Sequence, residues 1–112
     1  MRYTLTCRTH FDAAHFLPQH EGQCRNLHGH RWNVEVVVES DRLNPQGMIV
    51  DFGMIKKVVS EFDHKMLNDT ITNPTAEVIV AMLFTRLCDK GLAVKSVEVW
   101  ESPDCSVRVC SE

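Results

Sequence analysis

Three histidines near the N-terminus of the 112-residue chain have the types and spacing of a metal site. His28 and His30 are separated by one glycine and begin a stretch of alternating apolar residues, Trp32, Val34, Val36 and Val38. Such alternation predicts a strand on which both imidazoles share the apolar face, because successive side chains point to opposite faces. His15 ends an earlier extended segment and has the same parity as its apolar residues, so it is expected to point inward too.

The chemistry of this group depends on the third histidine. A pair of imidazoles on one strand is often structural or solvent-exposed, and the pair alone does not decide between that role and metal binding. Buried imidazoles need hydrogen-bond partners or an ion. Three neutral imidazoles without a fourth protein ligand are typical of a catalytic zinc that keeps one position open. The sequence therefore predicts a Zn²⁺ site formed by His15, His28 and His30.

The five cysteines are expected to be reduced. They include no Cys-x-x-Cys motif, and the N-terminus has no signal-peptide pattern, which argues against a disulfide framework. Cys7, Cys88 and Cys105 are interpreted as small buried residues. Cys24 is the exception, because a thiolate beside the histidine pair could take part in proton transfer.

Two acidic positions each have two interpretations. Asp63 and His64 lie where a helix is expected to end, where both residue types are ordinary. An aspartate can also hold a histidine in one tautomer, and such a histidine can activate a thiol such as Cys24. Glu101 has the parity of the apolar valines before it. Because burying an unpaired carboxylate is costly, Glu101 is either exposed at the strand end or bound to a ligand, such as an aminopyrimidine edge.

The periodicity of apolar residues predicts the elements that position these groups. Strands are expected at 2–9, with a continuation or bulge at 11–15, and at 28–39, 94–101 and 105–110; helices are expected at about 52–62, capped by Asp51, and from Pro74 to Gly91. The order strand, strand, helix, helix, strand, strand predicts an α+β fold with two helices on one face of a four-stranded antiparallel sheet. Residues 1–112 are expected to form a single domain. The two unpaired sheet edges favour assembly with other copies.

Composition excludes several classes of partner. The formal net charge is -3, with 12 basic against 15 acidic residues and no basic run, which argues against a nucleic-acid partner. No apolar segment is long enough to span a membrane. The expectation is a soluble cytoplasmic protein.

The motifs together resemble the 6-pyruvoyltetrahydropterin synthase and 6-carboxytetrahydropterin synthase superfamily. The resemblance covers nearly the whole chain and rests on the following motifs in order: Phe-x-Ala-Ala-His (11–15), Cys-x-x-x-His-Gly-His (24–30), Asp51-Phe52, Asp63-His64-x-x-Leu67-Asn68, Asn73-Pro74-Thr75-x-Glu77 and Glu101. It implies a tunnelling fold (T-fold), in which sheets of several chains join into a barrel. The implied assembly is a homohexamer of two trimers with active sites between subunits.

The resemblance also implies a role for each matching residue. His15, His28 and His30 would bind Zn²⁺, Cys24 with Asp63 and His64 would transfer protons, and Glu101, Thr75 and Glu77 would hold a pterin ring. The spacing from Cys24 to His28 resembles that of bacterial 6-carboxytetrahydropterin synthases, which act in queuosine and 7-deazapurine biosynthesis.

The reaction implied by that subgroup is a carbon–carbon lyase reaction. It converts 7,8-dihydroneopterin triphosphate into 6-carboxy-5,6,7,8-tetrahydropterin, acetaldehyde and triphosphate. Two alternatives stay open: 6-pyruvoyltetrahydropterin synthase activity, which eliminates triphosphate without cleaving the side chain, and a non-catalytic pterin-binding or metal-binding T-fold protein.

Overall fold

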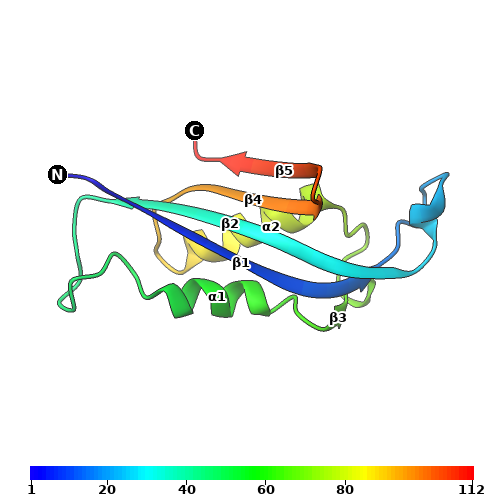
Figure 1. The fold of residues 1–112 in the computed structure, drawn as a ribbon, viewed down its shortest axis with the longest axis horizontal. Coiled ribbons are helices and arrows are strands. Elements are labelled where there is room, and N and C mark those ends of the chain that lie inside the picture. The colour runs from blue at the N-terminus through cyan, green and yellow to red at the C-terminus, as the bar shows by residue number, and fades with distance from the viewer.

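One mixed β-sheet is the frame of the molecule in the computed structural model, which describes residues 1–112. The strands are β1 (Tyr3–His15), β2 (His28–Ser40), β3 (Lys65–Met66), β4 (Val94–Ser102) and β5 (Cys105–Cys110), in the spatial order β3-β1-β2-β4-β5. Helices α1 (Phe52–Ser60) and α2 (Ala76–Asp89) cover one face of this sheet (Figure 1). The predicted α+β class is confirmed, and the predicted element order holds except for the short strand β3 between the two helices.

The sheet has five strands instead of the predicted four. The additional strand, β3, has two residues and pairs parallel to Ala13 and Ala14 at the end of β1, whereas the other neighbours are antiparallel. Two residues cannot show an alternating pattern, so periodicity gives no signal for such a strand.

The register of the β1–β2 hairpin decides where the three histidines lie. Each strand has 13 residues, and β1 runs without interruption to His15. His15 is opposite His28, and Ala13 is opposite His30. Because directly opposite residues share a face, all three imidazoles project from the core face at the loop end of the hairpin.

The core lies between this face and the helices. The strands contribute Phe11, Trp32, Val34, Val36, Val97 and Val99, and the helices contribute Ile55, Val58, Val59, Ile79, Val80, Leu83 and Leu87. Burying side chains of this size contributes about 1.5–3 kcal/mol each before entropy is counted. The strand face that carries the histidines is therefore packed against the apolar core.

α1 begins at its predicted cap, and α2 begins after a cap at Thr75 that was not predicted. The Asp51 carboxylate accepts a hydrogen bond from the Gly53 amide at 2.7 Å, and the Thr75 hydroxyl accepts one from the Val78 amide at 3.2 Å. α2 is followed by Gly91 in the left-handed region, with φ 86°. α1 ends at Ser60, earlier than predicted.

Three burial predictions are wrong. Phe52 is 55% exposed at the first turn of α1, although its spacing matched the apolar stripe. Cys88 and Cys105 are exposed, whereas Cys7 is buried as expected. The residue type does not show on which face of an element a cysteine lies. Cys88 and Cys105 lie on exposed faces of α2 and β5.

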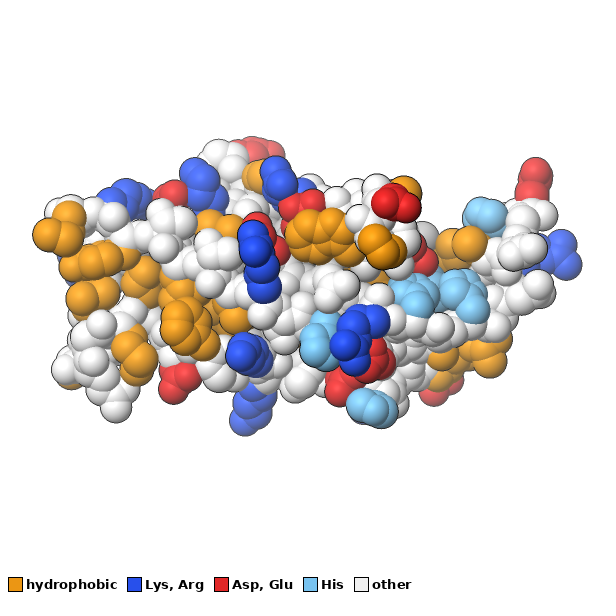
Figure 2. Space-filling model, in the orientation of Figure 1, with side chains coloured by type: hydrophobic (Ala, Val, Ile, Leu, Met, Phe, Trp, Pro, Cys, Tyr) orange, Lys and Arg blue, Asp and Glu red, His pale blue; other side chains and the backbone are white.

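Neither helix is long and apolar enough to cross a membrane. Basic and acidic side chains are interspersed over the face shown in Figure 2, while histidine side chains lie in the half of the molecule that contains the loop end of the hairpin.

Candidate metal centre

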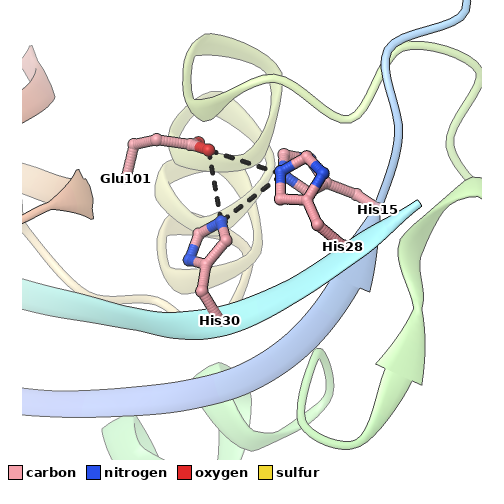
Figure 3. A group of neighbouring side chains, drawn as sticks. All are labelled: His15, His28, His30 and Glu101. Atoms are coloured by element: carbon pink, nitrogen blue, oxygen red, sulfur yellow. Dashed lines mark hydrogen bonds and ion pairs between the residues drawn. The ribbon is translucent and has the colours of Figure 1, made fainter. Parts of the chain in front are cut away.

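Three histidines and one glutamate converge at the loop end of the hairpin (Figure 3). His15, His28, His30 and Glu101 each offer one ligand atom, and these atoms lie within 4.8 Å of one another. Nε2 of His15 and Nε2 of His30 are 3.4 Å apart. In tetrahedral zinc sites, a zinc–nitrogen bond of about 2.0–2.1 Å separates ligand nitrogens by about 3.3–3.4 Å. The spacing of this pair thus matches the edge of a zinc tetrahedron.

Backbone carbonyl groups orient all three imidazoles. Nδ1 lies 2.8 Å from the Pro74 carbonyl in His15, 2.8 Å from the Asn26 carbonyl in His28 and 3.1 Å from the Arg31 carbonyl in His30. A carbonyl oxygen can only accept, so each Nδ1 donates its proton and each Nε2 is left with a lone pair. Every ring is therefore held in the tautomer that ligates through Nε2.

The pKa values of His15 and Glu101 are shifted in opposite directions by their mutual contact. Burial opposes the charged form of His15, but hydrogen bonds to Glu101 and to the Pro74 carbonyl outweigh burial and raise the pKa of His15. Burial also opposes the charged form of Glu101, but hydrogen bonds and positive charge from His15 and His30 lower the pKa of this carboxyl. The donor set of three imidazoles and one carboxylate fits a group that binds a divalent metal ion.

An aromatic wall separates the histidines from the core. The Trp32 ring is fully buried and lies 4.4 Å from the His30 ring and 4.8 Å from the His15 ring, measured between centroids. Its other contact is Phe11, stacked at 5.7 Å with an interplanar angle of 7°. Trp32 Nε1 is the one buried side-chain polar atom without a hydrogen-bond partner. The indole therefore packs the imidazoles through its shape and not through a hydrogen bond.

Asn68 connects the strand end that carries His15 to the following segments. Its side-chain oxygen accepts from the Phe16 amide and its side-chain nitrogen donates to the Phe16 carbonyl, both at 2.9 Å. This residue belonged to a recognised motif, but its clamp role, like those of the backbone carbonyls of Pro74 and Asn26, gives no signal in the sequence.

Asp63 and His64 form the predicted pair in the turn between α1 and β3. The Asp63 carboxylate is 2.9 Å from Nδ1 of His64 and accepts the Asp12 amide proton at 2.8 Å. That backbone hydrogen bond outweighs burial and, with His64, lowers the pKa of Asp63. The His64 side chain is 83% exposed. It lines a shallow cavity with Asp12 and Arg31. The parity of Asp12 and Arg31 places their side chains on the outer face of the sheet, opposite to the face that carries the histidine cluster.

Cys24 lies on the metal side instead. It is half-buried in a short 3-10 turn, Gln23–Arg25, and lines a small cavity with Asn26 and His28. No hydrogen bond links Cys24 to Asp63 or to His64. The structure therefore places the predicted thiol in the cavity that His28 lines, but no hydrogen bond joins it to its predicted acid–base partners within one chain.

The three residues predicted to hold a pterin ring are also separated. Glu101 contacts the histidines, the Thr75 hydroxyl caps α2, and Glu77 is exposed on the first turn of that helix. Thr75 follows Pro74, whose carbonyl binds His15, so the start of α2 lies beside the metal cluster. The contact of Glu101 with the metal group is a feature that the sequence interpretation missed, because a strand-end position does not reveal what lies opposite.

The fold and this site define a family of pterin-forming synthases. The chain belongs to the 6-pyruvoyl tetrahydropterin synthase family, whose sequence profile matches residues 4–112. It is 42% identical over 100 residues to a putative 6-carboxy-5,6,7,8-tetrahydropterin synthase of Archaeoglobus fulgidus, covering 86% of this chain and 85% of the relative. It is also 42% identical over 113 residues to the 6-carboxy-5,6,7,8-tetrahydropterin synthase of Synechocystis sp., covering 90% of this chain and 88% of the relative.

Solved structures confirm the predicted T-fold. The 6-pyruvoyl tetrahydropterin synthase of Caenorhabditis elegans superposes with a TM-score of 0.76 at 22% identity, covering 100% of this chain and 97% of that chain. A catalytic residue mutant of the Plasmodium vivax 6-pyruvoyltetrahydropterin synthase superposes with a TM-score of 0.70 at 21% identity and covers 97% of both chains. At these identities the likeness supports the fold alone.

Proposed function

We propose that this protein is a Zn²⁺-dependent 6-carboxy-5,6,7,8-tetrahydropterin synthase. The reaction is the carbon–carbon lyase conversion of 7,8-dihydroneopterin triphosphate into 6-carboxytetrahydropterin, acetaldehyde and triphosphate, in queuosine or related 7-deazapurine biosynthesis. The observation that carries the proposal is the convergence of three imidazole Nε2 atoms, each ring oriented by a backbone carbonyl. The names of two relatives at 42% identity support the choice of reaction.

The residue roles follow from the positions of the side chains. His15, His28 and His30 would hold the metal, which when bound supplies Lewis-acid polarisation of the substrate's side-chain oxygens. Cys24, beside His28, is placed to exchange a proton with the substrate's side-chain carbons as a thiolate. Asp63 accepts from His64 and holds its ring, so that Nε2 of His64 is free to exchange protons with the thiol or with solvent.

A second copy of the chain completes the acid–base group in this proposal. Cys24 and His64 do not meet within one chain, and His64 is largely exposed on the outer face. β5 pairs on one side only, and β1 pairs with β3 through two residues only, so both edges of the sheet offer unpaired backbone. A homohexamer of two trimers, with active sites between subunits, is the assembly that the family resemblance implies and these edges fit.

A cytoplasmic location fits the same role. All five cysteines are free, and three of them, Cys88, Cys105 and Cys110, are exposed on α2 and the C-terminal strand. Exposed thiols persist in a reducing compartment.

Product analysis tests the proposed reaction. Zinc-loaded protein is incubated with 7,8-dihydroneopterin triphosphate, and triphosphate and acetaldehyde are measured together. Both products are expected. Triphosphate without acetaldehyde would identify the pyruvoyl-forming reaction, and neither product from metal-loaded, assembled protein would favour a binding role. Cys24→Ala is the matched variant, because it leaves the histidines intact and is expected to reduce turnover by about 10²–10⁴-fold.

A further inference from the structure

Glu101 is bound to the histidine cluster and to no other side chain. Its Oε1 lies 3.2 Å from Nε2 of His30 and 3.4 Å from Nε2 of His15. Glu98, on the same strand, is held differently: it accepts hydrogen bonds from Ser106 at 2.6 Å and from Arg108 at 2.7 Å. One glutamate of β4 is thus locked by neighbours on β5, whereas the other has only the candidate metal ligands as partners.

The contact distances of Glu101 match those expected of a ligand. Each imidazole donates through Nδ1 to a carbonyl, so the Nε2 lone pairs and the carboxylate oxygen face one another. These three atoms, 3.2–3.4 Å apart, repel one another unless a proton or a metal ion lies between them. A divalent ion satisfies all of them at once, and carboxylate oxygen is an ordinary zinc donor at about 2.0–2.2 Å.

Glu101 also occupies the solvent side of the cluster. Its side chain is 35% exposed, against 23% for His30 and 1% for His15. A small molecule that approaches the metal position from solvent therefore meets the carboxylate before it meets the most buried imidazole.

The backbone around Glu101 departs from regular strand pairing. Pairing of β4 with β2 ends at Trp100 opposite Asn33, and the register with β5 shifts between Trp100 and Ser102. Glu101 lies at this irregularity, without a paired residue in either ladder. Bulges at such positions re-aim side chains and are frequent beside active sites.

We propose that Glu101 is an exchangeable fourth metal ligand, bound in the absence of substrate and released on substrate binding. With a metal bound, Glu101 would give up its ligand position to a substrate hydroxyl oxygen, and no electron transfer would be involved. The released carboxylate then accepts the N–H donors of the pterin's aminopyrimidine edge, as expected for a pterin-binding residue. This inference rests on the proposed function. It gives Glu101 two successive roles, as a metal ligand before substrate binds and as a pterin-binding residue afterwards.

Cobalt substitution tests the ligand role without turnover. The Co²⁺ dissociation constant and visible absorption of the wild-type protein are compared with those of Glu101→Gln and Glu101→Ala, with Glu98→Gln as the control on the same strand. Loss of a fourth protein ligand is expected to weaken Co²⁺ binding at least about tenfold and to change the absorption bands. Glu98→Gln is expected to leave both unchanged. Identical binding and bands in all four proteins would overturn the proposal.

A pterin without side-chain hydroxyl groups tests the exchange. Such a probe offers the aminopyrimidine edge but no oxygen for the metal, so its binding is expected to draw the carboxylate away and change the Co²⁺ bands of the wild type. The same probe is expected to leave the bands of Glu101→Ala unchanged. Probe binding without any spectral change in the wild type would show a fixed ligand and contradict the exchange.

These outcomes are distinct from failure of the proposed function. A wild-type protein that binds no metal, or that binds metal without releasing triphosphate and acetaldehyde, would overturn the proposed function. Normal turnover with unchanged Co²⁺ affinity in Glu101→Ala would overturn this inference alone. Circular dichroism and elution volume of each variant verify folding and assembly.

Discussion

The two faces of the β1–β2 hairpin carry two groups of chemical residues that are assembled in different ways. On the inner face, His15, His28 and His30 converge because the strand register sets them side by side. On the outer face, Asp63 orients His64 toward solvent, away from Cys24. One chain therefore brings the candidate metal ligands together, whereas it leaves the residues proposed for proton transfer apart.

Backbone strain marks the outer group as specifically positioned. His64 has φ 57°, in the left-handed region, which costs a non-glycine residue about 1–2 kcal/mol. Two hydrogen bonds with Asp12 offset that cost: the His64 amide donates to the Asp12 carbonyl at 2.7 Å, and the Asp12 amide donates to the Asp63 carboxylate at 2.8 Å. Strain that is maintained in this way is common at functional sites.

Removing an inner-face ligand should have the largest effect. His28→Ala leaves two imidazoles and Glu101, and turnover is expected to fall by about a thousandfold or more because Lewis-acid stabilisation is worth several kcal/mol. Metal content by mass spectrometry and turnover check it. His20→Ala is the matched control, because this exposed histidine lies in the loop that leads to β2 and its side chain accepts a hydrogen bond only from the Gly22 amide. Full metal content in His28→Ala would contradict the ligand assignment.

The outer group can be separated from the inner group by mixing two inactive variants. Cys24→Ala and His64→Ala are each expected to lose about 10²–10⁴-fold in turnover, the usual contribution of an acid–base group. When the two are co-expressed, random assembly should place a wild-type cysteine and a wild-type histidine together in about a quarter of sites formed between chains.

Recovery to that level, measured relative to wild type, supports shared sites. The control is a single variant that carries both Cys24→Ala and His64→Ala on the same chain. It should recover no activity. Absence of recovery in a verified mixed oligomer would mean that both groups act from one chain.

Loosening the wall behind the inner group should affect stability and metal binding together. Trp32→Ala removes a buried ring, and its cost to the free energy of unfolding is expected to be about 3–5 kcal/mol. Val36→Ala is the control, since Val36 is equally buried on the same strand but is absent from the aromatic contacts to the histidines. Denaturant unfolding and Zn²⁺ affinity are measured for both. Only Trp32→Ala should weaken Zn²⁺ binding, and equal affinities would show that the wall does not position the imidazoles.

The smallest effect is expected at Glu98, the glutamate of β4 that faces away from the metal. Its hydrogen bond from Ser106 outweighs burial and, with Arg108, lowers the pKa of Glu98. Because the folded-state pKa lies below that of the unfolded chain, this contribution is present above the ordinary glutamate pKa of about 4.3 and is lost as the pH falls through the lowered value.

Glu98→Gln therefore should reduce the free energy of unfolding by about 1–3 kcal/mol at neutral pH. The difference from wild type should shrink in acid, measured by urea unfolding over that range. A difference independent of pH would mean that the ionised pair is not its cause.

The sequence by itself determined the class of fold and the candidate metal donors. Alternation placed His15, His28 and His30 on the apolar face, and Asp51 and Pro74 marked the helix starts, because these features depend on spacing within one segment. The motifs led to a family that the whole-chain match confirms.

Tertiary structure decided what depends on contacts between segments. Periodicity could not predict the two-residue strand β3, the exposure of Cys88, or the turn that presents His64 on the outer face. The contact of Glu101 with the histidines depends on a register shift in β4, and a shift of one residue reverses the face that a side chain occupies. Local spacing therefore determined which residues can do chemistry, and strand register determined which of them meet.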